Sequence, residues 1–251
     1  MSPPVVALHG FSDSGACMRP FLHRLGLASA TTPALLGHDG RAMPPGTGFT
    51  HEALVADAAA TVAGVVDEAG APALLLGHSL GASTAAGVAA SAPDLVGLLV
   101  LEDPPWQAPT SPEQDEALEQ CNSHRPWLEG LQGTDRAGRL AWLQENHPGW
   151  PEDEWEPWEQ SKTQVDLALF DAPQRWLRRS WGQVTGQVRC PTLLLVGEPA
   201  LGSACDQAVA AHLGGGRWTV EVVVGAGHNV RRDRPERAAR LIRGWLATYG
   251  V

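Results

Sequence analysis

The stretch Gly77-His78-Ser79-Leu80-Gly81 decides the fold of this chain, because of what lies on each side of it. Before it runs Ala73-Leu74-Leu75-Leu76, which is typical of a buried strand, and after it the small residues of 82–90 favour a tightly packed helix. A G-x-S-x-G sequence between a strand and a helix is the pattern of a nucleophile elbow. Its glycines permit a tight turn that holds Ser79 in a strained backbone conformation with its hydroxyl exposed. The five residues alone are a weak signal, but in this setting the signal is strong.

Two further segments place polar residues directly after strands. Near the N-terminus the strand-like run Val5-Val6-Ala7-Leu8 is followed by His9-Gly10-Phe11, and near the C-terminus residues 220–224 lead into Gly225-Ala226-Gly227-His228. With the serine elbow between them, this order along the chain resembles that of the α/β-hydrolase family. The resemblance covers nearly all of the chain.

Alternating strands and helices indicate an α/β fold with a mostly parallel sheet covered by helices on both faces. The sequence predicts six strands, over about residues 4–9, 28–33, 73–77, 97–102, 191–196 and 218–224. Helical patterns fall near residues 16–26, 50–69, 80–91, 204–213 and 235–248. Relatives often begin with two additional strands before the His-Gly loop. This chain has no residues for them there, so we expect a reduced, six-stranded sheet.

A segment of different character interrupts this pattern. Residues 104–188 hold eight of the ten tryptophans and no strand-like run. Ser111-Pro112, Thr134-Asp135 and Gly149-Trp150-Pro151 indicate helix starts. An insertion at this place in the family is a helical cap above the active site. The resemblance therefore implies a core domain of residues 1–103 and 189–251 and a cap of residues 104–188, with about four helices over Ser79.

The chemistry centres on Ser79, because an unassisted hydroxyl is a poor nucleophile and needs a base. His228 is the candidate base, since it follows a late strand in a Gly-Ala-Gly-His loop. The resemblance also implies two oxyanion donors, the backbone amides of Leu80 and of Phe11. His9 is expected to brace the oxyanion loop, and His78 to play a structural part beneath the elbow.

The acid of the triad departs from the family pattern. After the strand 193–196 the family usually shows Gly-x-x-Asp, but here Ala200 occupies the Asp position. Some relatives carry the acid one strand earlier, and the equivalent position here is Asp103. We therefore assign Asp103 as the residue that orients His228. Glu102, Glu198 and Asp206 remain alternatives, as does a site with no acid at all. Asp206 also fits a capping box, in which its side chain would cap a helix instead.

Other polar residues receive structural interpretations. His23, His51, His124, His147 and His212 are interpreted as ordinary surface or core residues, and His38 as part of a structural loop. The arginines just past His228 indicate either a docking patch or, in preference, a solvated helix entrance; they are Arg231, Arg232, Arg234 and Arg237.

Composition limits the partners. The 28 acidic and 18 basic residues give a formal net charge of −10, which argues against nucleic acid or an anionic membrane as the main partner. The four cysteines form no C-x-x-C pair and no metal-ligand spacing, so we expect reduced thiols, no metal and no cofactor; they are Cys17, Cys121, Cys190 and Cys205. The first strand begins without a leader-like segment, and we expect a cytoplasmic protein that acts on a small molecule.

The resemblance implies a serine hydrolase that cleaves an ester or lactone through an acyl-enzyme. Serine at the elbow argues against haloalkane dehalogenase and epoxide hydrolase chemistry, which use a carboxylate nucleophile. The tryptophan-rich insertion favours a bulky apolar or aromatic substrate, unless these rings serve only to hold the insertion to the core. Phe11, Trp106 and Trp127 are the candidate substrate contacts.

Other functions remain open on the same site. A lyase or a cofactor-free C–C bond enzyme would use His228 for proton transfer without an acyl intermediate. A small-molecule receptor would keep a vestigial triad, although the intact elbow and oxyanion loop disfavour it. A thioesterase acting on an acidic carrier protein is disfavoured by the net negative charge.

Overall fold

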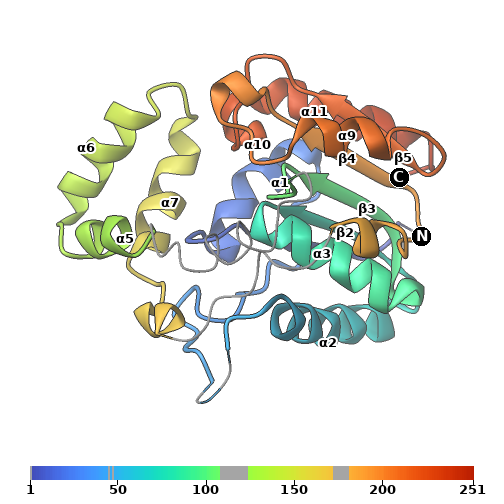
Figure 1. The fold of residues 1–251 in the computed structure, drawn as a ribbon, viewed down its shortest axis with the longest axis horizontal. Coiled ribbons are helices and arrows are strands. Elements are labelled where there is room, and N and C mark those ends of the chain that lie inside the picture. Colours follow the sequence, from blue (N-terminus) through green and yellow to red (C-terminus); the bar gives the residue numbers. More distant parts are fainter. Residues whose placement is uncertain (1, 45, 47, 108–123, 172–180) are drawn as a thin grey trace.

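The fold is seen in a computed structural model that describes residues 2–44, 46, 48–107, 124–171 and 181–251 (Figure 1). The described residues form one sheet of five strands, each parallel to the next, in the order β1-β2-β3-β4-β5. The strands are β1 (Val5–Leu8), β2 (Ala73–His78), β3 (Val96–Glu102), β4 (Thr192–Val196) and β5 (Trp218–Val222). Because the strands are parallel, their carboxyl ends share one edge, and the loops that follow them can meet there.

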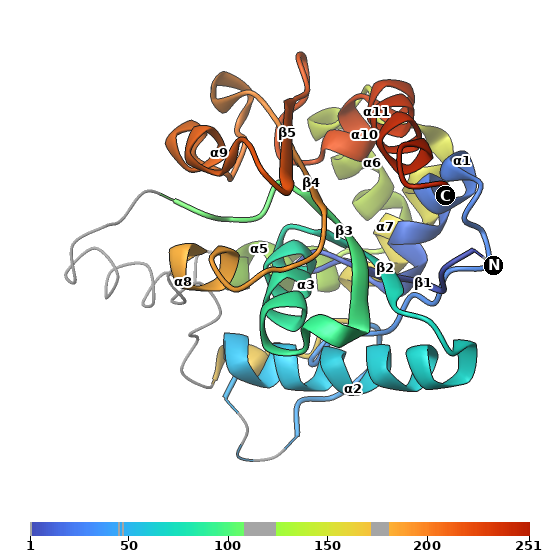
Figure 2. The ribbon, with the colours of Figure 1, turned by 90° about the vertical axis from the view of Figure 1, so that its right-hand side faces the viewer.

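Helices cover both faces of the sheet, as the sequence predicts. Helices α2 (His51–Ala69), α3 (Leu80–Ser91), α8 (Trp181–Thr185) and α9 (Gln207–Leu213) contribute to the core on one face. Helices α1 (Arg19–Leu25), α10 (Val230–Asp233) and α11 (Pro235–Ala247) contribute to the core on the other face (Figure 2).

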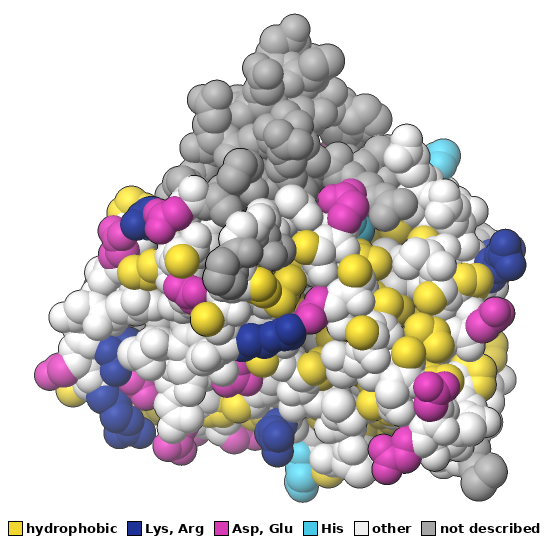
Figure 3. Space-filling view, turned by 90° about the horizontal axis from the view of Figure 1, so that it is seen from below, with side chains coloured by type: hydrophobic (Ala, Val, Ile, Leu, Met, Phe, Trp, Pro, Cys, Tyr) yellow, Lys and Arg dark blue, Asp and Glu magenta, His cyan; other side chains and the backbone are white. Residues whose placement is uncertain are grey.

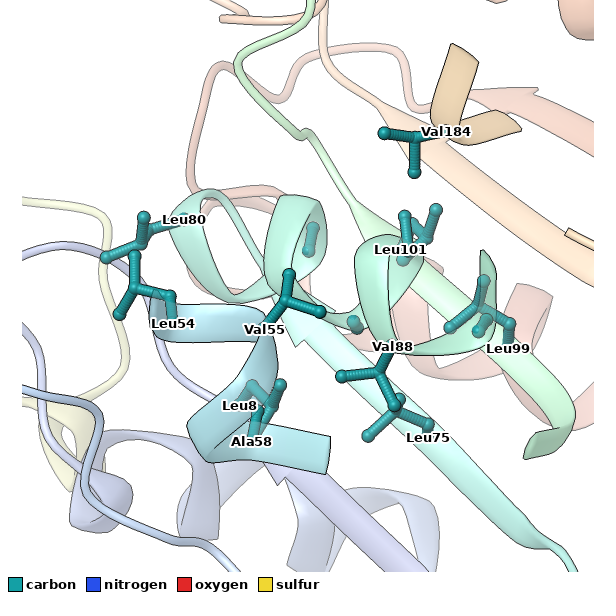
Figure 4. Close-up of a cluster of buried hydrophobic side chains, with 14 of the residues drawn as sticks. Leu8, Leu54, Val55, Ala58, Leu75, Leu80, Val88, Leu99, Leu101 and Val184 are labelled. Carbon is teal, nitrogen blue, oxygen red and sulfur yellow. The ribbon is translucent and has the colours of Figure 1, made fainter. Parts of the chain in front are cut away.

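The strand side chains alternate between these two cores, because successive residues of a strand point to opposite faces. Leu75 lies in the core beneath α2 and α3, whereas Leu74 and Leu76 lie in the core beneath α1 and α11. Figure 4 shows the first core, where Leu8, Leu75 and Leu99 from three strands meet side chains of α2, α3 and α8. Both faces of β2 and β4 are buried along their whole length, so these two strands are rich in consecutive leucines.

The sixth predicted strand, over residues 28–33, is not a strand in the structure. Thr31 forms an isolated parallel bridge with Val6, made by the bonds Ala7 N to Thr31 O and Thr31 N to Val5 O, both 2.9 Å. The segment therefore lies at the β1 edge, where the pattern placed it, but it pairs at one point. Pro33 has no backbone N–H and cannot extend the ladder.

The segment between β3 and β4 is helical in its described part. It contains α5 (His124–Gln132), α6 (Arg136–Asn146), α7 (Trp155–Lys162), α8, and the short 3-10 helices η3 (Glu152–Glu154) and η4 (Leu167–Phe170). Figure 1 shows α5, α6 and α7 grouped at one end of the molecule, beside the sheet. The start predicted at Thr134-Asp135 is confirmed, because the Asp135 side chain caps α6 by accepting from Gly138 N at 2.8 Å. The start predicted at Ser111-Pro112 lies outside the described residues, as does Trp176.

On the face shown in Figure 3, acidic and basic side chains are scattered among hydrophobic and uncharged ones. Within the described ranges no helix has the length and apolarity needed to cross a bilayer. The same ranges contain no group of three or more His, Cys, Asp or Glu side chains placed to hold a metal ion. Cys17, Cys190 and Cys205 are buried free thiols, and Cys121 lies outside the described residues.

Candidate active site

The predicted elbow is a sharp turn between β2 and α3. Ser79 has φ 53° and ψ −116°, and α3 begins at the next residue. Positive φ is uncommon for a residue with a side chain, so the predicted backbone strain is present. Gly81 is required by close packing: a Cβ there would lie 2.3 Å from the carbonyl oxygen of Leu8. The turn is thus pressed directly onto the end of β1.

Ser79, His228 and Asp103 form one continuous chain of hydrogen bonds. The Ser79 hydroxyl lies 2.9 Å from His228 Nε2, and His228 Nδ1 lies 2.7 Å from Asp103 Oδ2. In the neutral imidazole this arrangement places the proton on Nδ1 and leaves Nε2 to accept from the serine. Asp103 is fully buried, whereas the His228 side chain is 31% exposed. The structure therefore brings together the three residues that the sequence analysis selected.

Donors from the loop after β4 hold the Asp103 carboxylate. Its Oδ1 accepts from Ser203 Oγ at 2.5 Å, and its Oδ2 accepts from the Ala204 amide at 2.7 Å. Ala200, which stands where the family usually has its Asp, lies in the same loop within η5 (Pro199–Leu201). The loop after β4 has Ala200 in place of the usual Asp, but it donates two hydrogen bonds to Asp103 at the end of the neighbouring strand β3.

The three alternative acids have other partners. Glu102 accepts from the Arg231 amide at 2.7 Å and from its guanidinium at 3.1 Å. Glu198 accepts from the Gly225 amide at 2.6 Å and so supports the loop that leads to His228. Asp206 caps α9, where it accepts from the Ala208 amide at 2.8 Å.

The loop after β1, residues 9–13, is held by its own histidine. The Leu35 amide donates to His9 Nε2 at 3.1 Å, so Nδ1 carries the proton and donates to the Gly10 carbonyl at 2.9 Å. Burial lowers the pKa of His9, which keeps the ring neutral in this arrangement. The expected bracing by His9 is therefore present as two hydrogen bonds.

Gly10 lies against the elbow. A Cβ there would be 2.6 Å from His78 Nδ1 and 3.4 Å from the Ser79 Cβ, so only glycine allows this approach. His78 in turn donates from Nε2 to the His228 carbonyl at 3.2 Å. Burial and the charge of Arg231 lower the pKa of His78 well below its usual value. A neutral, buried His78 thus connects the elbow to the histidine loop.

The ring of Phe11 lies in a group of aromatic side chains. His124 of α5 and Phe170 of η4 have ring centroids 5.3 Å and 5.9 Å from it. His38 and Phe49 of the core are 5.4 Å and 6.3 Å away. Residues of the inserted segment therefore meet the core at the residue next to Gly10.

The other two candidate substrate contacts, Trp106 and Trp127, pack against other tryptophans. Trp106 is 6% exposed and packs against Trp218 of β5, with ring centroids 6.4 Å apart. Trp127 is half-buried, and its ring lies 5.9 Å from that of Trp142. Of the three candidates, Phe11 is the one in the loop that packs on the elbow.

Six charged side chains are buried together beside this site, and we call them the buried charge cluster. Its members are Asp13, Glu102, Glu154, Lys162, Arg231 and Arg232, each at most 6% exposed. Asp13 lies at the centre, with ion pairs of 3.2 Å to Lys162 and 3.0 Å to both Arg231 and Arg232. Arg232 also pairs with Glu154 at 2.9 Å. The interpretation of Arg231 and Arg232 as solvated or docking residues is wrong, because both side chains are buried, at 1% exposure, and are paired inside the molecule.

The charges of this cluster stabilise one another. Burial raises the pKa of Asp13, but Arg232, Lys162 and Arg231 outweigh burial and hold that pKa well below its usual range. Burial also lowers the pKa of Lys162, and the charge of Asp13 opposes this effect. Removal of one partner would leave an uncompensated buried charge, which is strongly destabilising.

Sequence reasoning missed two features of the site. One is the buried charge cluster, whose ion pairs join residues 78 or more positions apart and leave no local pattern. The other is His124, interpreted as an ordinary residue, which contacts Phe11. Burial lowers the pKa of His124, and the charge of nearby His228 adds to this effect. No spacing signal singles out His124 among nine histidines.

Comparisons with known proteins concern the family and the fold. The sequence model described as the Alpha/beta hydrolase family matches residues 5–241. Lipase LipV of Mycobacterium tuberculosis is 37% identical over 101 residues, which are 40% of this chain and 36% of the lipase. The crystal structure of an E-2-(acetamidomethylene)succinate hydrolase matches with a TM-score of 0.74 at 25% identity, over 98% of this chain and 91% of that one. A malate-bound thermophilic esterase from Thermogutta terrifontis matches in fold, with a TM-score of 0.71 at 24% identity, over 99% and 90%.

Proposed function

Because the chain belongs to the alpha/beta hydrolase family, we propose that it is a serine hydrolase that cleaves an ester or lactone through an acyl-enzyme. The observation that carries this proposal is the continuous chain of hydrogen bonds from Ser79 through His228 to Asp103. A serine with a base in hydrogen-bond reach, and a third group that orients the base, is the arrangement of an activated nucleophile.

Each member of the triad has a distinct role in this proposal. The Ser79 oxygen attacks the substrate carbonyl while His228 Nε2 takes its proton, and His228 then gives that proton to the leaving alcohol. Water attacks the acyl-enzyme in a second step with the same proton transfers, which releases the acid and restores Ser79. Asp103 holds His228 in the tautomer that can accept from serine, and stabilises the imidazolium that forms.

The negative charge on the tetrahedral intermediate requires donors already in place. We assign the amides of Leu80 and Phe11 to this oxyanion hole. Leu80 is the first residue of α3, so its N–H stands outside the repeating hydrogen bonds of the helix and at its positive end. Phe11 follows Gly10, which lies against the elbow.

We propose further that residues 104–188 form a cap over Ser79, on a core of residues 1–103 and 189–251. The contacts of His124 and Phe170 with Phe11 support this division, because they bring the inserted segment to the oxyanion loop. The aromatic surroundings of Phe11 favour an apolar or aromatic acyl group, since rings provide a large and rigid contact area.

The test is the intact mass of the protein after incubation with a fluorophosphonate, followed by a panel of esters and lactones. We expect one adduct per wild-type molecule and none on Ser79→Ala, with hydrolysis by wild type only. Ser79→Ala removes the nucleophile but preserves the backbone, so its thermal unfolding should match that of wild type. An unlabelled, inert wild type would remove the acyl-enzyme mechanism and favour a lyase or a receptor.

A further inference from the structure

The single lysine of the chain, Lys162, ends helix α7 of the inserted segment and is almost fully buried, at 1% exposure. Its ammonium group donates to the Ser12 carbonyl at 2.7 Å, to the Ser12 hydroxyl at 3.0 Å and to Asp13 Oδ1 at 3.2 Å. All three hydrogens of the ammonium group thus have acceptors in the loop after β1. Burying an ammonium group costs free energy unless the group is paired. Here its three hydrogen bonds all go to two adjacent residues, Ser12 and Asp13.

These two residues fix the shape of the oxyanion loop. Ser12 has φ 62°, a left-handed conformation that is unfavourable for a residue with a side chain. The Asp13 amide donates to the Gly10 carbonyl at 3.2 Å, and His9 Nδ1 donates to the same carbonyl. In a trans peptide the C=O and N–H groups point in opposite directions, so the bonds to this carbonyl set the direction of the Phe11 N–H.

We propose that Lys162 is a positioning residue that holds the Ser12–Asp13 turn and thereby aims the Phe11 amide at the oxyanion. The inference rests on the proposed function and extends it, because it gives the inserted segment a part in transition-state stabilisation. Arg231 and Arg232 also pair with Asp13. The bonds to the Ser12 carbonyl and hydroxyl are what Lys162 adds to them.

The variant Lys162→Met retains the apolar stem and removes the ammonium group. Donors aimed at the oxyanion act mainly in the transition state, so their misalignment lowers kcat and leaves KM nearly unchanged. We expect kcat to fall by about 10- to 100-fold, less than the loss of an entire oxyanion donor. The inhibition constant of an arylboronic acid, which forms a tetrahedral adduct on serine, should rise by a similar factor.

Glu159→Gln is the matched control on the same helix. Glu159 is 3% exposed and forms a buried ion pair with Arg139 at 2.7 Å, so its loss should also destabilise the inserted segment. Among the described residues its ion-pair partners are Arg136 and Arg139, which belong to α6 and not to the oxyanion loop. We expect a lower Tm for Glu159→Gln with kcat, KM and boronate affinity near those of wild type. Equal kinetics in the two variants would overturn the proposal, and so would a fall in kcat without weaker boronate binding.

Two further measurements test the role of Lys162 if Lys162→Met does not fold or if the protein has no esterase activity. If Lys162→Met does not fold, Ser12→Ala removes one bond to the ammonium group, and an unchanged kcat and boronate affinity there would overturn it. If the wild-type protein neither reacts with a fluorophosphonate nor cleaves an ester, the proposed hydrolase function is rejected, independently of the role of Lys162. Hydrogen exchange of the peptide over residues 9–17 then tests the positioning: faster exchange in Lys162→Met than in Glu159→Gln supports it, and equal rates reject it.

Discussion

Asp103 adopts φ 43°, a backbone conformation that residues with side chains rarely occupy. Asn and Asp are the side chains that best tolerate this left-handed region, so Asp103→Asn can retain the local backbone. The amide of asparagine cannot act as a carboxylate toward Nδ1 of His228, and the imidazole then favours the wrong tautomer. The effect of this substitution should therefore appear in catalysis more than in folding.

We expect Asp103→Asn to lower kcat for an ester by about 10⁴-fold, the scale seen when a triad acid is neutralised. Steady-state kinetics measure it, with Asp206→Asn as the control, because asparagine caps a helix as well as aspartate does. A nearly unimpaired Asp103→Asn beside a crippled Glu198→Gln would reassign the acid.

The sequence predicts the residues of the hydrogen-bonded triad because each follows a local signal. Ser79 lies in a five-residue pattern, His228 follows a late strand, and Asp103 ends a strand while Ala200 replaces the usual Asp. Asp103 accepts hydrogen bonds from Ser203 Oγ and the Ala204 amide, which lie 100 and 101 residues later in the sequence. Their position depends on how the loop after β4 folds. No motif or spacing in the sequence predicts where this loop lies.

At the scale of elements, the strands and helices of the core follow from apolar periodicity, with boundaries within a few residues. The segment 28–33 pairs with β1 only at Thr31, and Pro33, which has no backbone N–H, stops the ladder from extending past Thr32. The backbones of β1, β2 and α3 pack more closely than the sequence alone indicates. A comparison of Gly81 in α3 with Gly64 in α2 tests this close packing.

Gly64 and Gly81 are both helical, but their surroundings differ. A Cβ at Gly64 in α2 meets nothing within 4 Å, whereas one at Gly81 in α3 would lie 2.3 Å from the Leu8 oxygen and 2.5 Å from the His9 oxygen. We expect Gly64→Ala to stabilise the protein by about 0.5–1 kcal/mol, because alanine is the better helix former. Gly81→Ala should destabilise it by about 3 kcal/mol or more, since backbone must move.

Urea unfolding of the two variants measures both effects. Gly64→Ala serves as the control for the change in helix propensity, so the difference between the variants isolates the contact with β1. Similar midpoints for both would mean that the elbow does not press on β1.

At the scale of the whole molecule, buried neutral histidines make the stability sensitive to acid. Burial lowers the pKa of His38 to about 3, against 6.5 for an unburied imidazole. Between these values the unfolded chain binds a proton at this site and the folded chain does not, so stability falls as the pH falls from 6.5 toward 3. Burial also lowers the pKa values of His9 and His78, which adds to the effect.

The contribution of His38 should be about 1.4 kcal/mol per pH unit once the pH is well below 6.5. Urea unfolding of wild type and His38→Asn at about pH 7 and about pH 5.5 tests this, because asparagine does not titrate there. Glu102, whose pKa burial raises, acts in the opposite direction, and the difference between the two proteins removes its contribution. Parallel pH dependence in the two proteins would show that His38 is not the source.

The buried charge cluster also bears on the order in which the protein can mature during synthesis. Lys162 leaves the ribosome 149 residues after Asp13, and Arg231 leaves it 218 residues after Asp13. At ordinary translation speeds the second interval is roughly 10 to 40 s, during which the carboxylate lacks the cations that allow its burial. The loop after β1 can therefore reach its final form only after Arg231 has been made. A nascent chain that stalls before Arg231 would lack two of the three cations that pair with Asp13, so this loop would stay in a form that proteases can attack.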